Sequence, residues 1–194
     1  NGTYVDPDGV KFYGKSGSLC DGSLFASDPD AAIAAGIDWL ELRINSALGI
    51  ANTPPADGPA GGAPNVCDYW IVSAGSNDLS FIQGVLDDPN NPLSSIWTWD
   101  NRLPVVTEAM RQGLLRMIDD GAKYICVWSP IDRPNVPKSR SQQLRNLYQE
   151  MVNELNGDQA QVIMVDINTL YFEDTSMHHD TVPHPNAKGM GLWI

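Results

Sequence analysis

The sequence predicts an α/β protein with a mostly parallel sheet. Three short apolar runs of strand length alternate with two amphipathic stretches of helical length between residues 69 and 166. Strands that are joined through helices run parallel, and parallel strands covered on both faces are apolar throughout their length. Ligands of such open sheets bind at the carboxyl ends of the strands, so the polar residues that follow each strand are the first candidates for function.

The N-terminal part gives weaker signals. Residues 10–13 predict a short strand, and residues 52–64, which are rich in Pro, Gly and Ala, predict an irregular loop. Residues 30–48 predict one helix, because apolar side chains recur there at helical spacing: Ile33, Ile37, Leu40, Ile44 and Leu48. No repeat or linker divides the chain, so we expect residues 1–194 to form a single domain.

The segments after the loop give clearer signals. The predicted strands are Tyr69–Ala74, Lys123–Trp128 and Gln161–Asp166, and the predicted helices are Pro104–Asp120 and Ser141–Leu155. Pro104 suits the first turn of a helix, and Gly121 and Gly157 are typical residues just beyond a helix end.

The composition indicates a soluble globular chain. Hydrophobic residues make up 42% and charged residues 19%, which argues against a disordered or fibrous protein. The longest apolar stretch, near residues 31–37, is far shorter than the roughly 18 residues that a bilayer span requires. The net charge of −12 repels phosphate groups, so nucleic acid and anionic membranes are poor candidates as partners.

The first residue and the cysteines favour a secreted, extracellular protein. The chain starts at Asn1 with no basic and apolar leader, as a processed chain would. Cys126 lies in an apolar run and is expected to be a buried thiol. Cys20 and Cys67 lie in loop-like sequence and are compatible with a disulfide bridge, which would require an oxidising compartment.

Polar residues at three predicted strand ends form a chemically coherent set. Gly14–Ser18 follow the first predicted strand, Gly75–Asp78 follow the second, and Asp180 and His184 lie near the C-terminus. A serine hydroxyl, an imidazole base, a carboxylate that orients it and donors for an oxyanion are the groups that acyl transfer requires.

These blocks resemble the SGNH, or GDSL, hydrolases, a superfamily of esterases and lipases. Gly75-Ser76-Asn77-Asp78 is similar to the family's G-x-N-D block, and His184-Pro185-Asn186 with Gly189 is similar to its H-P-N-x-x-G block. Residues 121–130 resemble its "GA-strand-P" stretch. The resemblance extends from Cys67 to the C-terminus. It implies a three-layer α/β/α fold with a flavodoxin-like, mostly parallel sheet, with or without one edge or terminal element.

The resemblance also implies roles for individual residues. Asn77 would donate its side-chain amide to the oxyanion, and His184 would be the catalytic base. Residues 12–18 resemble the nucleophile block F-G-D-S-x-S, which makes Ser16 the candidate nucleophile, with Lys15 where Asp is usual. Asp180 is the candidate acid, but it precedes His184 by four residues instead of three, so a bulge is needed to bring it into place. Without that bulge, a backbone carbonyl would orient the imidazole.

The second oxyanion donor has two candidates. Residues 61–63 resemble the family's G-G-A block, which makes Gly62 the donor but leaves little chain for a helix and a strand before Asn77. A rival alignment takes residues 10–17 as the second strand and block, makes Gly17 the donor, and implies a nucleophile upstream of this chain. Its merit is a well-placed helix between the second block and the block of Asn77. We favour Ser16 as nucleophile, because the rival removes a central strand of the sheet instead of an edge strand.

The sequence therefore predicts a secreted serine ester hydrolase that forms an acyl-enzyme and needs no metal or organic cofactor. Its substrate would be a small-molecule, lipid or polysaccharide ester. Two alternatives stay open. One is a non-catalytic or truncated module of the same fold with a binding or structural role. The other is a zinc-dependent deacetylase-like enzyme that uses the cluster of His178, His179, Asp180 and His184.

Overall fold

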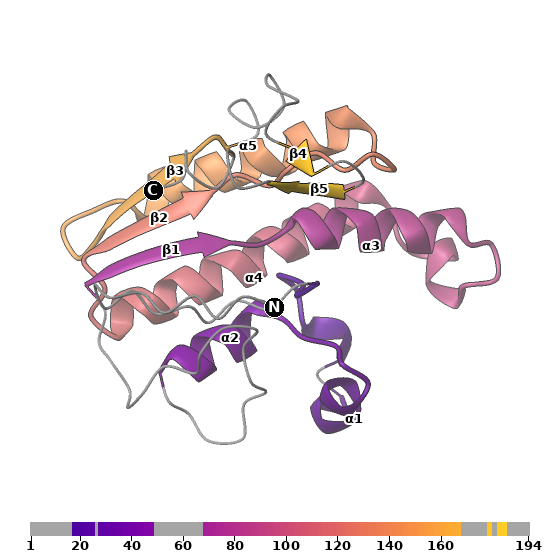
Figure 1. Ribbon diagram of the computed structural model, residues 1–194, viewed down its shortest axis with the longest axis horizontal. Helices are drawn as coiled ribbons and strands as arrows, with labels where there is room; N and C mark the ends of the chain where they lie inside the picture. The colour runs from indigo at the N-terminus through magenta and orange to yellow at the C-terminus, as the bar shows by residue number, and fades with distance from the viewer. Residues whose placement is uncertain (1–16, 26, 49–67, 168–177, 180–181, 186–194) are drawn as a thin grey trace.

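The computed structural model describes residues 17–25, 27–48, 68–167, 178–179 and 182–185 of the chain. These residues form an α/β fold built on a parallel sheet of three strands in the order β1-β2-β3 (Figure 1). The α/β class and the parallel strands that the apolar runs predict are thus confirmed. The strand predicted at residues 10–13 and the loop predicted at residues 52–64 lie outside the described residues.

The three parallel strands end at one edge of the sheet. They are β1 (Tyr69–Ser73), β2 (Tyr124–Trp128) and β3 (Gln161–Val165), each within a residue or two of its predicted bounds. The register aligns the last residues of the strands, Ser73 with Trp128 and Trp128 with Val165. The segments that follow the strands therefore leave the sheet together, as expected for strands joined by helical crossovers.

Three long helices follow the strands or connect them. They are α3 (Ser76–Asp87), α4 (Trp99–Asp119) and α5 (Lys138–Leu155). The predicted start of α4 at Pro104 is wrong, since a capping box begins the helix at Trp99 and Pro104 lies inside it. In that box the Asn101 N–H donates to Thr98 Oγ1 at 3.2 Å, and the Thr98 N–H donates to Asn101 Oδ1 at 3.0 Å.

The single helix predicted over residues 30–48 is also wrong. Two helices occupy this range, α1 (Pro29–Ala34) and α2 (Leu40–Ala47). Gly36 ends α1 in a left-handed conformation with φ +79°, and its N–H donates to the Ile33 carbonyl while the Ile37 N–H donates to the Ala32 carbonyl, both at 2.9 Å. This pattern is a Schellman motif. The apolar spacing continues across the break because both helices pack against buried residues.

The main core lies between one face of the sheet and helices α4 and α5. The sheet contributes Val72, Ile125, Val127 and Val162, and the helices contribute the fully buried side chains Met110, Leu114, Leu144, Tyr148 and Met151. The two helices run beside the strands (Figure 1). The packing of α4 and α5 on this face holds the strands in place, and the candidate site lies where the strands end.

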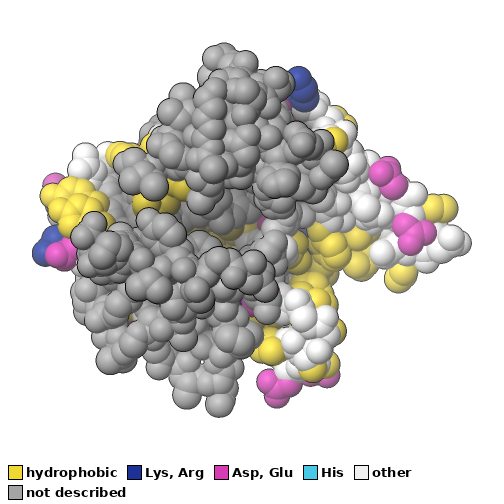
Figure 2. All heavy atoms as spheres, viewed as in Figure 1, with side chains coloured by type: hydrophobic (Ala, Val, Ile, Leu, Met, Phe, Trp, Pro, Cys, Tyr) yellow, Lys and Arg dark blue, Asp and Glu magenta, His cyan; other side chains and the backbone are white. Residues whose placement is uncertain are grey.

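The opposite face of the sheet is exposed. Tyr69 and Ile71 of β1 are 73% and 63% exposed, and Ile163 of β3 is 46% exposed. Tyr69 stacks on Tyr124 with ring centroids 4.8 Å apart, and Figure 2 shows hydrophobic side chains at the end of the molecule where β1 begins. The expectation that both faces are buried is therefore wrong for these positions. Aromatic and β-branched residues favour strands whether or not a second layer covers them.

The remaining elements are short. Two 3₁₀ helices span Ser23–Phe25 (η1) and Pro92–Ser95 (η2), and the strands β4 (His178–His179) and β5 (Val182–Pro185) form an antiparallel pair. Among the residues that the structure describes, no helix combines the length and the apolar character needed to cross a membrane.

Candidate active site at the carboxyl edge of the sheet

The turn after β1 carries the Gly75–Asp78 block into the first turn of α3. Gly75 precedes the helix with φ +102°, a conformation that favours glycine. A Cβ atom at this position would lie 2.6 Å from the Tyr148 hydroxyl oxygen, so packing excludes a side chain as well. The turn thereby presents Asn77 and Asp78 at the helix N-terminus, where partial positive charge favours an anion.

The Asn77 side chain joins two segments that are distant in sequence. Its Nδ2 donates to the Ser18 carbonyl oxygen at 2.9 Å. Its Oδ1 accepts a hydrogen bond from Nη2 of Arg133, in the segment after β2. An amide nitrogen carries two hydrogens, so Nδ2 keeps a second hydrogen besides the one given to Ser18. The side chain is thus oriented from both ends and has the group that an oxyanion would require.

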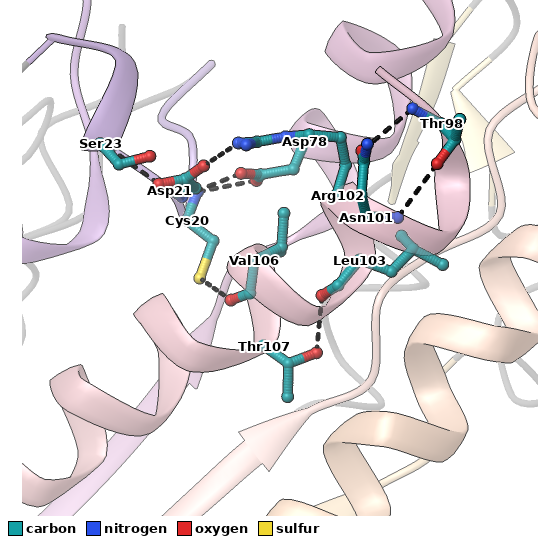
Figure 3. Close-up of polar contacts among 10 residues, drawn as sticks. All are labelled: Cys20, Asp21, Ser23, Asp78, Thr98, Asn101, Arg102, Leu103, Val106 and Thr107. Carbon is teal, nitrogen blue, oxygen red and sulfur yellow. Dashed lines mark hydrogen bonds and ion pairs between the residues drawn. The ribbon is translucent and has the colours of Figure 1, made fainter. Parts of the chain in front are cut away.

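Asp78 anchors the Ser18–Asp21 segment to the same turn. Its carboxylate accepts the backbone N–H of Cys20 at 2.7 Å and that of Asp21 at 2.9 Å (Figure 3). Asp78 is 3% exposed. Burial raises the pKa of Asp78 from 3.8 to about 6, while the hydrogen bonds from the Asp21 and Cys20 N–H groups act in the opposite direction.

A second buried carboxylate extends this network to α4. Asp21 pairs with the guanidinium of Arg102 at 2.5 Å and accepts the Ser23 N–H at 2.8 Å (Figure 3). The Arg102 guanidinium also lies 4.4 Å from the centroid of the Trp97 ring. The Ser18–Asp21 segment is therefore held against both α3 and α4.

The segment after β2 closes the other side of the edge. The Ile131 N–H donates to Ser76 Oγ at 2.8 Å, and Arg133 Nε donates to the Ser76 carbonyl at 3.1 Å. Ser129 donates its hydroxyl to Asp166, just beyond β3, at 2.9 Å. Hydrogen bonds thus connect the segments that follow all three strands, as the strand-end rule predicts.

Of the predicted site residues, Gly17, Asn77 and His184 fall in the described part, and the structure brings the segments of Gly17 and Asn77 together. Gly17 is exposed, has φ +82°, and directly precedes the residue whose carbonyl accepts from Asn77. Ser16, Gly62 and Asp180 lie outside the described residues, and their roles stay predictions.

The predicted base lies in the antiparallel pair. His184 is in β5, and the pairing of β4 with β5 is irregular between His178 and His179. In the view of Figure 1 this pair is drawn past the arrowheads of β1 and β2. Among the described residues, no group of three or more His, Cys, Asp or Glu side chains is arranged to hold a metal ion.

The cysteines differ from expectation. Cys20 is a free, buried thiol, with Sγ 3.6 Å from the Tyr148 hydroxyl and 3.5 Å from the Val106 carbonyl. Cys20 therefore does not take part in the bridge considered for it, and Cys67 lies outside the described residues. Cys126 is also free and is half-buried, because its side chain lies on the exposed face of the sheet with Ile71 and Ile163.

Sequence reasoning missed Arg133, Asp21 and Arg102. Arg133 follows a predicted strand by only a few residues, so the strand-end rule could have singled it out. Asp21 and Arg102 had no comparable signal, because their pairing spans 81 positions. The chain matches no family model, no curated protein and no solved structure. The geometry and the motif resemblance are therefore the basis for a functional proposal.

Proposed function

We propose that this protein is a secreted serine ester hydrolase of the SGNH type. The observation that carries the proposal is the contact between Asn77 and the Gly17–Ser18 segment at the carboxyl edge of a parallel sheet. That contact joins the block resembling G-x-N-D to the residues that directly follow the candidate nucleophile in the sequence. The proposal includes a three-layer, flavodoxin-like fold, of which the described α/β sheet would be the central part.

The mechanism follows from the chemistry of these groups. Ser16 lies two positions before the carbonyl that Asn77 contacts. Its Oγ would attack the ester carbonyl carbon while His184 takes the hydroxyl proton, and Asp180 would orient the imidazole. The second N–H of Asn77 Nδ2 and the backbone N–H of Gly62 would stabilise the oxyanion. Collapse of the tetrahedral intermediate would release the alcohol, protonated by His184, and water would then cleave the acyl-enzyme.

One observation favours the rival assignment of the N-terminal blocks. Helix α2 lies between the Gly17 segment and β1, where the alignment with Gly17 as oxyanion donor expects a helix. Both alignments use Asn77 and His184 and differ in the nucleophile. The free Cys20 removes the disulfide as an argument for secretion.

A serine-reactive fluorophosphonate probe tests the proposal. We expect covalent labelling of Ser16, identified by mass mapping of the labelled peptide, together with hydrolysis of a short-chain aryl ester. Ser16→Ala should lower kcat by about 10³-fold or more, because the nucleophile is lost. Ser95→Ala is the matched control, since Ser95 is exposed in η2, where its hydroxyl donates to the Pro92 carbonyl at 3.1 Å, and it has no role in the mechanism.

The other outcomes each point elsewhere. Hydrolysis that survives Ser16→Ala but is lost with His184→Ala would contradict Ser16 as nucleophile. Hydrolysis that a chelator abolishes would favour a zinc enzyme. Neither labelling nor hydrolysis across a panel of aryl, lipid and acetylated-sugar esters would contradict the enzymatic function and favour a non-catalytic module.

A further inference from the structure

We infer that Arg133 is a positioning residue, which orients and polarises the Asn77 amide as an oxyanion donor. The inference rests on the proposed function, because it assigns a role within the same site. Arg133 lies within the segment that connects β2 to α5, 56 positions from Asn77. No motif resemblance carried any role to it.

The guanidinium of Arg133 donates hydrogen bonds to two neighbouring residues of the turn after β1. Nη2 donates to the Asn77 side-chain oxygen, and Nε donates to the Ser76 backbone carbonyl at 3.1 Å. A planar guanidinium presents its N–H groups in a rigid fork, so two bonds to neighbouring residues define both position and angle. The side chain is half-buried, which strengthens these bonds relative to bonds in water.

This arrangement decides which end of the Asn77 amide faces the segment of the candidate nucleophile. An arginine has donors and no acceptor, so the amide oxygen must face Arg133. The amide nitrogen must then face the opposite way, where it donates to the Ser18 carbonyl at 2.9 Å. The flipped amide would set two donors against each other on one side and two carbonyl oxygens on the other. Arg133 thus disfavours the flipped amide orientation, in which Nδ2 could not donate to an oxyanion.

The positive charge has a second effect. A cationic donor on the amide oxygen draws electron density from the amide nitrogen and makes the Nδ2 hydrogens stronger donors. An oxyanion gains more from such a donor than a neutral ester carbonyl does. The effect of Arg133 should therefore be larger in the transition state than in the bound substrate.

The segment that carries Arg133 is itself held in place. The Ile131 N–H donates to Ser76 Oγ at 2.8 Å, and Arg145 contacts Asp132 at 2.6 Å and the Pro130 carbonyl at 3.2 Å. These bonds come from α3 on one side and α5 on the other. Arg133 therefore approaches Asn77 from a supported backbone, which a positioning role requires.

The test is steady-state kinetics of Arg133→Met, which keeps the length of the side chain and removes charge and donors. We expect kcat to fall by about 10²-fold with KM within about threefold of wild type, as for loss of a transition-state interaction. Added guanidinium ion should restore part of kcat in Arg133→Met. Arg140→Met is the matched control, because Arg140 pairs with Asp100 away from Asn77 and should leave both constants unchanged.

A double-mutant cycle with Asn77→Ala separates positioning from a general structural effect. If Arg133 acts through Asn77, the double variant should be no slower than Asn77→Ala alone. Additive losses would contradict the inference, as would a rise in KM at unchanged kcat, which would instead indicate substrate binding. If Arg133→Met fails to fold, Arg133→Lys takes its place in the same cycle. Failure of the proposed function is distinguishable, because the wild type itself would then not hydrolyse esters through Ser16.

Discussion

Asp78 holds the N-terminal segment to α3 at an electrostatic cost. Its carboxylate accepts two backbone N–H groups, yet burial outweighs them and raises its pKa to about 6. An acid whose pKa is higher in the folded state than in the unfolded state binds its proton more tightly when folded. Its contribution to stability is therefore fully present below about pH 4 and is lost as the pH rises through 6.

Asp78→Asn removes this titration. The difference in unfolding free energy between wild type and Asp78→Asn should therefore change with pH. We expect that difference to shift against the wild type by at most about 3 kcal/mol between pH 4 and pH 7. Urea unfolding of both proteins at matched pH values measures it. A difference that does not change with pH would contradict the raised pKa, whatever the absolute cost of the substitution.

The residues of the site differ in how far they could be predicted. Asn77 could be found because it follows an apolar strand within a recognisable block. Arg133 follows a predicted strand closely enough to be a candidate, but its bond to Asn77 could not be predicted. That bond depends on the path of the segment after β2, which is set by contacts such as Arg145 with Asp132. The local sequence pattern predicts where a strand ends. It does not predict which side chains tens of residues apart will contact each other.

Two helices depend on glycines in left-handed conformations for different reasons. Gly36 ends α1 with open space around its Cα, whereas Gly75 starts α3 against the buried Tyr148. An alanine at either position has unfavourable φ, but only at Gly75 does the new Cβ also meet a side-chain oxygen at 2.6 Å. The same substitution should therefore have unequal costs in the two places.

We expect Gly36→Ala to lower the free energy of unfolding by about 1 kcal/mol and Gly75→Ala to lower it by about 3 kcal/mol. Chemical denaturation of the two variants in parallel gives the comparison. Gly84→Ala, in an open position inside α3, is the control and should be neutral or stabilising by up to about 1 kcal/mol. Equal costs at Gly36 and Gly75 would contradict the contact with Tyr148.

The helix boundaries show where local patterns are insufficient. Apolar spacing correctly predicted the bodies of α4 and α5, although α5 begins at Lys138 and not at the predicted Ser141. It could not predict the end of α1 at Gly36, because the apolar spacing continues into α2. The start of α4 was missed because Asn101 takes the capping position where Glu or Gln is the usual signal. Single side chains determine where a helix is capped, and the spacing of apolar residues carries no information about them.

The molecule combines a well-packed core on one face of its sheet with apolar side chains that remain exposed on the other. Periodicity predicted the α/β class, since apolar runs of strand length alternate with helical stretches. It could not predict the exposed face, because Ile71 and Ile163 have the same strand preference as the buried Val72 and Val162. Neighbouring residues of β3 therefore allow a direct comparison of the two faces.

Ile163→Thr and Val162→Thr should have unequal effects on stability. Val162 is 1% exposed, so a hydroxyl there is buried and should lower the free energy of unfolding by about 1–3 kcal/mol. Ile163 is 46% exposed, so its replacement should change stability by less than about 1 kcal/mol while reducing binding of an apolar fluorescent dye. Equal destabilisation would show that both faces are buried in solution.

The enclosed Cys20 thiol makes detachment of the N-terminal segment measurable. Its sulfur is packed between α4 and Tyr148 of α5, and the adjoining backbone is tied to Asp78. A maleimide can reach it only after those ties break, whereas Cys126 is half-buried and does not depend on them. The alkylation rate of Cys20 relative to that of Cys126 thus measures how often the N-terminal segment that contains Cys20 detaches from the helices.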